Sequence, residues 1–174
     1  MDRLGDSMRT VASLTLALGC LLAALFASPL TGPAAAKPSL DDKERAIVRA
    51  INRQRSKHGL TRLRASRRLA RAADFHSWEM LDADYFAHES RDGGPFDQRV
   101  RRYADHKALG ETLAMLGGCG RKAARKVVSM WMHSPGHRAI LLSSSYRRVG
   151  LGRRTGELRG DRTCVVTADF GSKK

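Results

Sequence analysis

The sequence predicts an α+β domain in which helices pack on a small antiparallel sheet. Apolar residues repeat at helical spacing through much of the chain up to residue 131, whereas alternating patterns are concentrated after residue 146. Helices that come mostly first and strands that come mostly last are typical of this class. With 174 residues, the chain has room for one domain and little more.

The first 36 residues are expected to be a secretory signal peptide (residues 1–36) rather than part of the domain. Two arginines precede an uncharged stretch from Val11 to Ala27, and prolines and a run of alanines follow it. This order favours cleavage after Ala36, which leaves residues 37–174 as the domain. An uncleaved membrane anchor is the alternative, because the apolar stretch is slightly long for a signal core. We therefore expect a secreted or periplasmic protein with no stable membrane span after cleavage.

The expected mature chain is strongly basic. Residues 37–174 hold 30 basic and 15 acidic residues, so the net charge of +15 belongs to the domain itself. Export argues against nucleic acid as a partner. A charge excess indicates attraction to anions but predicts neither a fold nor a reaction. The expected partners are a cell-envelope polymer, a lipid or another anionic ligand, and the oligomeric state is left open.

Two cysteines remain after the expected cleavage. Cys119 and Cys164 are most simply a disulfide, because an exported protein meets an oxidising environment. Two free, buried thiols are the alternative.

Two segments in the first half of the domain have the spacing of amphipathic helices. The first begins around Ser39 to Asp42, whose side chains are typical of helix starts, and ends near His58. The second begins at Ser66 and carries His76 within its apolar stripe. A histidine in such a stripe is more often a hydrogen-bonded core residue than a ligand, so the core interpretation is favoured.

Two further helices are expected before the last strands. A short one carries Phe96, Val100 and Tyr103 on a strongly basic background, and its outer face is expected to be solvated. A longer one runs from Arg121 into Trp131, with apolar residues at i, i+3, i+4 and i+7.

Alternation and glycines indicate the strands. In the last of them, even-numbered apolar residues from Cys164 to Phe170 fall on one face. Gly156 and Gly160 support an antiparallel hairpin between the last two strands, and a brief apolar turn over 140–142 is expected before them. The expected strands are 110–115, 146–152 and 163–170.

The segment from Trp131 to Arg138 reads Trp-Met-His-Ser-Pro-Gly-His-Arg and is expected to break a helix. Proline lacks a backbone donor and prevents the helix from continuing, so the backbone at the break fixes the direction of His137. The same break separates His133 from His137, and the pair is therefore not expected to form a metal site on one helical face.

Candidate chemistry rests on dispersed polar residues, because the zinc-protease helix motif, the phosphate-binding glycine loop and the G-x-S-x-G elbow are absent from the sequence. Two imidazoles and a carboxylate can bind zinc, with water completing the tetrahedron. Spacing alone does not show that they converge. The candidates, which interrupt otherwise apolar patterns, are His88, Glu111, His133, Ser134 and His137.

An ordered series of short motifs spans nearly the whole domain and resembles the bacterial branch of the CAP superfamily, the cysteine-rich secretory or SCP-like extracellular proteins. The order and spacing of the motifs carry the resemblance. The motifs are Ile51-Asn52-x-x-Arg55, Gly59-Leu60-x-x-Leu63, Ala73-x-x-His76-Ser77-x-x-Met80, Phe86-x-His88, Gly110-Glu111, Trp131-x-x-Ser134-Pro135-Gly136-His137-Arg138, Tyr146-x-x-Val149-Gly150-Leu151-Gly152 and Phe170-Gly171.

The resemblance implies a three-layer α-β-α sandwich with a small antiparallel sheet and a cleft lined by a histidine and glutamate tetrad. His88, Glu111 and His137 match three tetrad positions, and the two histidines bind a divalent metal such as zinc in some members. The fourth position, a glutamate in eukaryotic members, is Ser134 here, and Thr112 stands where the family motif has asparagine. The serine removes one carboxylate from any hydrolytic scheme.

Two functions compete on these residues. The favoured one is a secreted binding module for a lipid, glycan or other cell-envelope ligand, with His88, Glu111, Ser134 and His137 in the cleft and no cofactor required. In it, Glu111 is expected to accept hydrogen bonds from the helix break and from one imidazole.

The alternative is a zinc-dependent hydrolase in which His88 and His137 hold the metal and Glu111 receives the proton of the bound water. Ser134 paired with His137 as a nucleophile is a third and weaker possibility, because no acid that would orient the histidine is identified.

Overall fold

Five helices and four strands make up residues 39–172, which are the residues described by this computed structural model. The helices are α1 (Asp42–Lys57), α2 (Arg67–Asp82), α3 (Phe96–Arg101), α4 (Ala123–His133) and α5 (Pro135–Leu141). The strands are β1 (Arg64–Ala65), β2 (Leu109–Leu116), β3 (Tyr146–Leu158) and β4 (Asp161–Ser172).

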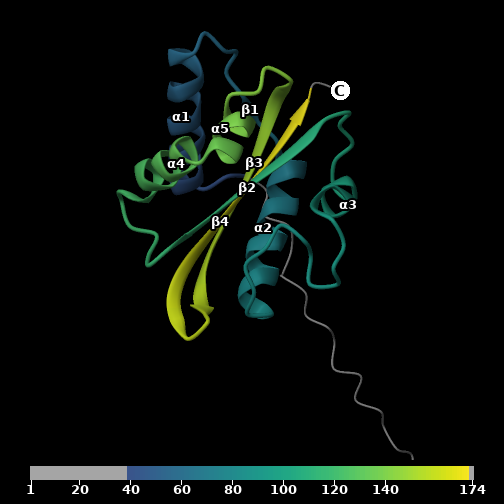
Figure 1. The fold of residues 1–174 in the computed structure, drawn as a ribbon, viewed down its shortest axis with the longest axis vertical. Helices are drawn as coiled ribbons and strands as arrows, with labels where there is room; N and C mark the ends of the chain where they lie inside the picture. The colour runs from purple at the N-terminus through teal and green to yellow at the C-terminus, as the bar shows by residue number, and fades with distance from the viewer. Residues whose placement is uncertain (1–38, 173–174) are drawn as a thin grey trace, which may run out of the picture. The chain divides into compact units, whose positions relative to one another are not determined.

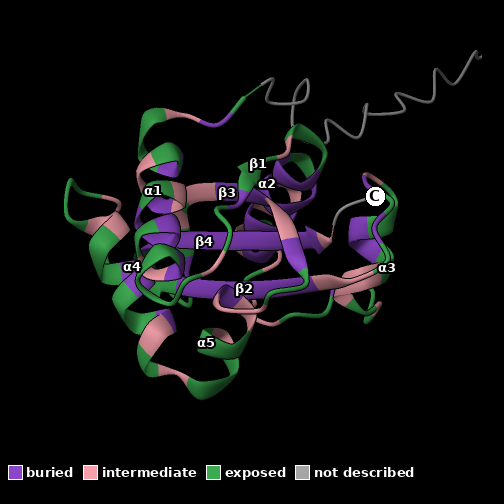
Figure 2. Ribbon diagram, turned by 90° about the horizontal axis from the view of Figure 1, so that it is seen from above, coloured by how far each residue is buried: buried purple, intermediate pink, exposed green. Residues whose placement is uncertain are grey.

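The elements form three layers around a four-stranded sheet of order β1-β3-β4-β2. Helix α2 packs on β3 and β4, with α3 beside it, and α1, α4 and α5 pack together on the other face (Figure 1). Buried residues lie along the strands and on the helix faces turned toward them (Figure 2). The predicted α+β class and three-layer α-β-α sandwich are confirmed.

Side-chain caps start the first two helices where the sequence predicted them. Asp41 accepts a hydrogen bond from the backbone N–H of Glu44, and Glu44 accepts one from the N–H of Asp41, both at 2.8 Å. Ser66 caps α2 through the N–H of Leu69. These bonds satisfy donors that the first turn of a helix leaves without partners.

The sheet is antiparallel except at one edge. β4 pairs antiparallel with both β2 and β3, whereas the two residues of β1, which the sequence did not predict, pair parallel with β3. The hairpin between β3 and β4 turns at Arg159 and Gly160, both of which have positive φ angles, as a two-residue turn of this kind requires. Gly156 lies within β3 rather than in the turn.

Close packing of α2 on β3 depends on two glycines. A Cβ at Gly150 would lie 2.1 Å from the backbone nitrogen of Ala70, and one at Gly152 would lie 2.2 Å from that of Asp74. Ser77, on the same helix, donates a hydrogen bond to the carbonyl of Gly152 at 3.2 Å. The helix backbone therefore rests directly on the strand, which fixes the position of α2 along the sheet.

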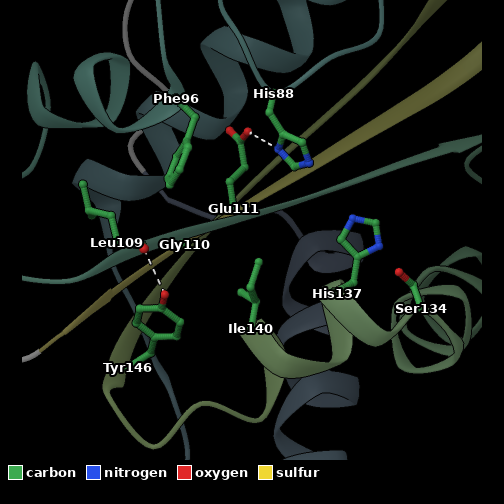
Figure 3. Close-up of a pocket in the computed structure, with 10 residues that line it drawn as sticks. His88, Phe96, Leu109, Gly110, Glu111, Ser134, His137, Ile140 and Tyr146 are labelled. Atoms are coloured by element: carbon green, nitrogen blue, oxygen red, sulfur yellow. Dashed lines mark hydrogen bonds and ion pairs between the residues drawn. The ribbon is translucent and has the colours of Figure 1, made fainter.

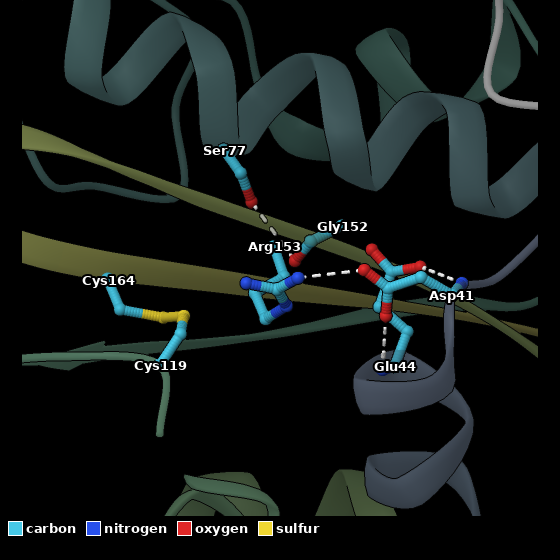
Figure 4. The surroundings of a disulfide bond; sticks show 7 residues. All are labelled: Asp41, Glu44, Ser77, Cys119, Gly152, Arg153 and Cys164. Carbon is cyan, nitrogen blue, oxygen red and sulfur yellow. Dashed lines mark hydrogen bonds and ion pairs between the residues drawn. A yellow bond between two sulfur atoms is a disulfide. The ribbon is translucent and has the colours of Figure 1, made fainter. Parts of the chain in front are cut away.

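The larger part of the core lies between the sheet and α1, α4 and α5. The even-numbered face of β4, from Cys164 to Phe170, packs there as predicted, together with the fully buried Trp131. Cys119 and Cys164 form the predicted disulfide, shown in Figure 4, which joins β4 to the loop after β2. Because it closes a loop spanning 45 residues, the disulfide is expected to stabilise the fold by about 4 kcal/mol in the chain-entropy account.

Figure 4 also shows how the start of α1 is fixed to the sheet. Arg153 of β3 pairs with Asp41 at 2.7 Å, and Asp41 is the residue that caps α1. The cap and the ion pair therefore share one carboxylate.

The segment after the helix break differs from what the sequence predicted. Residues 135–141 form helix α5, not the brief apolar turn expected over 140–142, because proline at the first position of a helix loses no hydrogen bond and has a suitable φ angle. The expected signal peptide lies outside the described residues. None of the helices between residues 39 and 172 is long and apolar enough to cross a membrane.

Replacing Gly152 with alanine is predicted to lower the free energy of unfolding by about 3 kcal/mol or more, because the new methyl group would overlap helix backbone that cannot move aside. Chemical denaturation measures the change. Gly156→Ala is the matched control on the same strand, since its Cβ would meet only the flexible side chain of Leu81 at 3.3 Å. The control should change stability by about 1 kcal/mol or less, and equal losses in both variants would contradict the close approach of α2.

Candidate functional site

A cleft of about 480 Å³ opens at β2, the edge strand of the sheet, where the two helical layers meet. Figure 3 shows His88, Phe96 and Glu111 on one side of β2, with Ser134, His137 and Ile140 on the other. The four candidate residues His88, Glu111, Ser134 and His137 all line this cleft, as expected. The other lining residues are Leu109, Gly110, Gly136 and Tyr146.

Glu111 lies at the floor of the cleft and is held by two cationic partners. Its Oε1 accepts a hydrogen bond from His88 Nδ1 at 2.8 Å, and its Oε2 pairs with the guanidinium of Arg99. Burial raises the pKa of Glu111, but the hydrogen bond from His88 and the charge of Arg99 outweigh burial, and the pKa lies below the ordinary value. Glu111 therefore stays ionised while its charge is balanced inside the protein.

One of the two expected partners of Glu111 is found, the imidazole of His88, and the other is not. The sequence suggested that Glu111 would accept hydrogen bonds from the helix break, but Arg99 of α3 takes that place. Arg99 is 1% exposed and also donates to the carbonyl of His88 at 3.1 Å. The face of α3 that carries Arg99 is thus buried. The sequence spacing already indicates this burial, because Arg99 falls on the same helical face as Phe96, Val100 and Tyr103.

The loop that carries His88 is fixed by a second buried carboxylate, Glu79 of α2. Its oxygens accept hydrogen bonds from the hydroxyl of Tyr85 at 2.8 Å and from the backbone N–H of Arg91 at 3.2 Å. His76 Nδ1 lies 3.1 Å from Glu79, and its Nε2 donates to the carbonyl of Ala87 at 2.9 Å. His76 is therefore the buried structural histidine that the sequence favoured, and it holds the residue just before His88.

Aromatic side chains cover the outer edge of β2 on both sides of Glu111. Trp131 donates to the carbonyl of Leu113 at 2.7 Å, and Tyr146 donates to the carbonyl of Leu109 at 2.9 Å. Gly110 makes room for Tyr146, since a Cβ there would lie 2.5 Å from the tyrosine oxygen. Because backbone groups along a strand repeat their direction every second residue, the peptide carbonyl of Glu111 points to the same edge and faces the cleft.

The two histidines of the cleft have opposite pKa shifts. The hydrogen bond to Glu111 raises the pKa of His88, whereas burial and the charge of His88 lower the pKa of His137. Their ring centroids are 6.4 Å apart (Figure 3). Over the pH interval between the two values, the cleft therefore holds one imidazolium and one neutral imidazole.

His137 reaches the cleft from the first turn of α5, immediately after the predicted helix break. Ser134 is the last residue before Pro135 starts the new helix. His133 remains on α4, where its Nδ1 donates to the carbonyl of Ser129 at 2.7 Å, so the two histidines lie on separate helices as expected. Ser134 and His137 both line the cleft, but no hydrogen bond joins their side chains within residues 39–172.

Asp169 is a buried carboxyl group that the sequence did not single out. It lies directly opposite Glu111 across the β2 and β4 pair and is fully buried. Neither of its oxygens has a hydrogen-bond partner among the described residues. Burial, together with the negative charge of Glu111, raises the pKa of Asp169 well above its ordinary value.

The donor set for a metal is incomplete within the described part of the chain. His88 Nε2 and His137 supply two imidazoles, but Glu111 is already bound to Arg99 and His88. No group of three or more histidine, cysteine, aspartate or glutamate side chains between residues 39 and 172 is arranged to hold a metal ion. Catalytic zinc usually has three protein ligands. Glu111 could become a third ligand beside His88 and His137 only by leaving one of its present partners.

Comparisons with known proteins agree with this geometry. The profile of the cysteine-rich secretory protein family, CAP, matches residues 48–170. The chain is 34% identical to the Bacillus subtilis protein YkwD over 118 residues, which cover 67% of this chain and 44% of that protein. An extracellular protein containing an SCP domain from Bacillus anthracis is 28% identical, with a TM-score of 0.62, over 74% of this chain and 40% of that one.

A fourth comparison concerns the fold alone. An outer surface protein from Borrelia burgdorferi has a TM-score of 0.64 at 19% identity, over 78% of this chain and 98% of that one. The chain spans less than half the length of the two Bacillus proteins.

Replacing Arg99 with methionine is predicted to lower the free energy of unfolding by about 3 to 5 kcal/mol, because Glu111 would remain buried without its main counter-charge. Arg102→Met is the control: this arginine is exposed and lies 3.9 Å from Asp92. Its loss should cost less than about 1 kcal/mol. Similar small losses in both variants would mean that the Arg99 pair does not organise the site.

The pKa of His88 is predicted to be higher than that of His137, and Glu111→Gln should lower it, because the variant removes the charge and acceptor that stabilise the imidazolium. NMR titration of the two rings measures both values. Since folding raises the pKa of His88, its contribution to stability is complete below the unfolded pKa and is lost as pH rises through the folded value. A His137 that titrates above His88 would contradict the assignment.

Proposed function

Because the chain belongs to the bacterial branch of the CAP family, the cysteine-rich secretory proteins, we propose that its domain is a secreted binding module for a cell-envelope ligand. The ligand occupies the cleft between His88 and His137. Among lipid, glycan and other envelope components, the cleft walls favour an amphipathic lipid with a compact acidic head.

The main support for this proposal is that one wall of the cleft is apolar and one end of it is polar. Phe96, Leu109 and Ile140 supply the apolar wall, and the two histidines stand at the polar end. A volume of about 480 Å³ lies within the range of small-molecule sites, which usually combine apolar walls with a few polar groups that orient the ligand. An acyl chain fits the first part, and a head group that accepts hydrogen bonds fits the second.

Charge at the polar end selects the head group. Glu111 is neutralised by Arg99 and His88, so it repels an anion less than a free carboxylate would. His88 has its Nε2 free when its Nδ1 donates to Glu111, and its raised pKa favours the charged imidazolium. A carboxylate or similar acidic head would gain a charge-assisted hydrogen bond there.

A zinc-dependent hydrolase is the weaker candidate for the same residues. His88 and His137 would hold the metal, and Glu111 would receive a proton from its water, but Glu111 is occupied by two cationic partners whose charges lower its basicity. A binding module needs no such proton transfer. The binding module is therefore favoured, and zinc binding by the purified protein would count for the hydrolase.

Ile140→Trp is predicted to weaken binding of a fluorescent polyene fatty acid at least tenfold, because the indole would fill the apolar part of the cleft. Fluorescence titration measures the dissociation constant. Met130→Trp is the matched control, since Met130 is 41% exposed on α4 and does not line the cleft. Binding in the cleft should change little when NaCl rises from about 0.05 to 0.5 M, whereas binding to the basic surface should weaken steeply.

Equal loss in the two tryptophan variants, or no saturable binding by the unmodified protein, would contradict the lipid proposal. Zinc is tested separately by equilibrium dialysis with the metal alone. The hydrolase would be favoured over the binding module if the unmodified protein binds zinc stoichiometrically and if its zinc affinity falls at least tenfold in both His88→Ala and His137→Ala.

A further inference from the structure

A second hollow, of about 270 Å³, lies away from the histidine cleft and is lined almost entirely by arginine. Arg62 and Thr61 come from the loop after α1, Arg64 comes from β1, and two arginines come from the start of β3. The lining residues are Thr61, Arg62, Arg64, Arg147 and Arg148, and we call the four arginines among them the arginine cluster. None of them also lines the histidine cleft.

Strand pairing forces two members of the arginine cluster together. Arg64 and Arg148 are direct partners in the parallel pair of β1 and β3. Like charges placed opposite one another on neighbouring strands are destabilising. The two side chains therefore leave neighbouring strands at the same level of the sheet, and both line the hollow.

An irregularity in β3 brings a third arginine to the same hollow. Successive side chains of a regular strand point to opposite faces, so Arg147 and Arg148 would normally diverge. The register of β3 shifts between Tyr146 and Arg148, and such bulges redirect side chains. Arg147 is also held in place, because its guanidinium donates to the carbonyls of Ser144 and Tyr146.

The positive charge of the arginine cluster has no carboxylate to balance it. No ion pair within residues 39–172 involves any of its four members. The sequence explains why, since neither 45–73 nor 112–156 contains an aspartate or a glutamate. Both of the stretches that supply the cluster are therefore free of acidic residues.

A buried cation beneath the cluster adds to the same field. Arg55 is fully buried and donates only to backbone carbonyls, namely those of Thr61 at 2.9 Å, Leu141 at 2.7 Å and Ser143 at 2.9 Å, with a longer contact to Tyr146. Burial and the charge of Arg147 lower the pKa of Arg55. Five guanidinium groups thus share one region without a counter-charge from the described residues.

We propose that the arginine cluster is a binding site for a phosphate group. A guanidinium presents parallel N–H donors that match two oxygens of a phosphate, and several converging guanidiniums with the Thr61 hydroxyl can surround a tetrahedral dianion. The phosphate could belong to a lipid head group or to a small soluble phosphate ester, because both present the same oxygens. The site is independent of the histidine cleft and of whatever ligand that cleft holds.

Calorimetric titration of the purified protein with inorganic phosphate tests the site. We expect saturable binding that falls at least tenfold in the double variant Arg64→Gln, Arg148→Gln. The double variant Arg67→Gln, Arg68→Gln is the matched control, because it removes the same charge from exposed residues outside the hollow. The control should stay within twofold of the unmodified protein. Equal loss in both double variants, or no binding by the unmodified protein, would overturn the proposal.

Three further variants test the geometry of the site and its independence from the histidine cleft. Arg62 lies in a loop and is exposed, so Arg62→Gln should weaken phosphate binding even if the strand variants fail to fold. Arg148→Lys keeps the charge but loses the paired donors, and it should bind more weakly than the unmodified protein if the guanidinium geometry matters. Ile140→Trp, which blocks the histidine cleft, should leave phosphate binding unchanged. Loss of phosphate binding in that variant would overturn the independence of the two sites.

Two arms then identify the source of the phosphate. Vesicles containing phosphatidate are compared with vesicles of phosphatidylcholine alone, and soluble glycerol phosphate is titrated in parallel. Binding to phosphatidate vesicles that requires Arg64 and Arg148, with no binding of glycerol phosphate, supports a lipid head group. Binding of glycerol phosphate that requires the same residues supports a soluble ester. Binding in either arm that does not require them counts against the site.

Discussion

The buried pair of Arg99 and Glu111 is the interaction on which the cleft depends. It joins α3 to the edge strand β2, and the same arginine holds the backbone of His88, whose ring completes the partners of the carboxylate. An ionised carboxylate is costly to bury unless its charge is matched and its oxygens are hydrogen-bonded. One guanidinium thus lets a glutamate stay charged at the floor of the cleft and also sets the direction of the histidine above it.

The position of the cleft follows from the layered architecture. β2 is an edge strand, and the loop between α2 and α3 contributes His88 from one face of the sheet while α5 contributes His137 from the other. An open edge exposes backbone groups that could pair with another chain. Here Trp131 and Tyr146 occupy two of its carbonyls and leave the intervening peptide of Glu111 facing the space where a ligand would sit.

The features that could be predicted from the sequence are those that depend on local chemistry. The caps of α1 and α2, the break before His137 and the alternation of β4 depend on neighbours in the chain, and the structure confirms each of them. Convergence of His88, Glu111 and His137 followed from the resemblance to CAP proteins, not from spacing. Arg99, Glu79 and Asp169 were missed because their importance arises from partners distant in the sequence. The helical spacing places Arg99 on the apolar face of α3, but it does not identify Glu111 as its partner.

The uneven placement of carboxylates gives the domain an electric dipole across its sheet. Residues 66–107, which include α2 and α3, contain eight acidic and eight basic residues, whereas residues 112–145, which include α4 and α5, contain five basic residues and none that is acidic. A protein with such a charge separation is turned by the field of an anionic surface before contact. The α1, α4 and α5 layer therefore carries the positive end of this dipole, and the cleft at the sheet edge lies between the two ends.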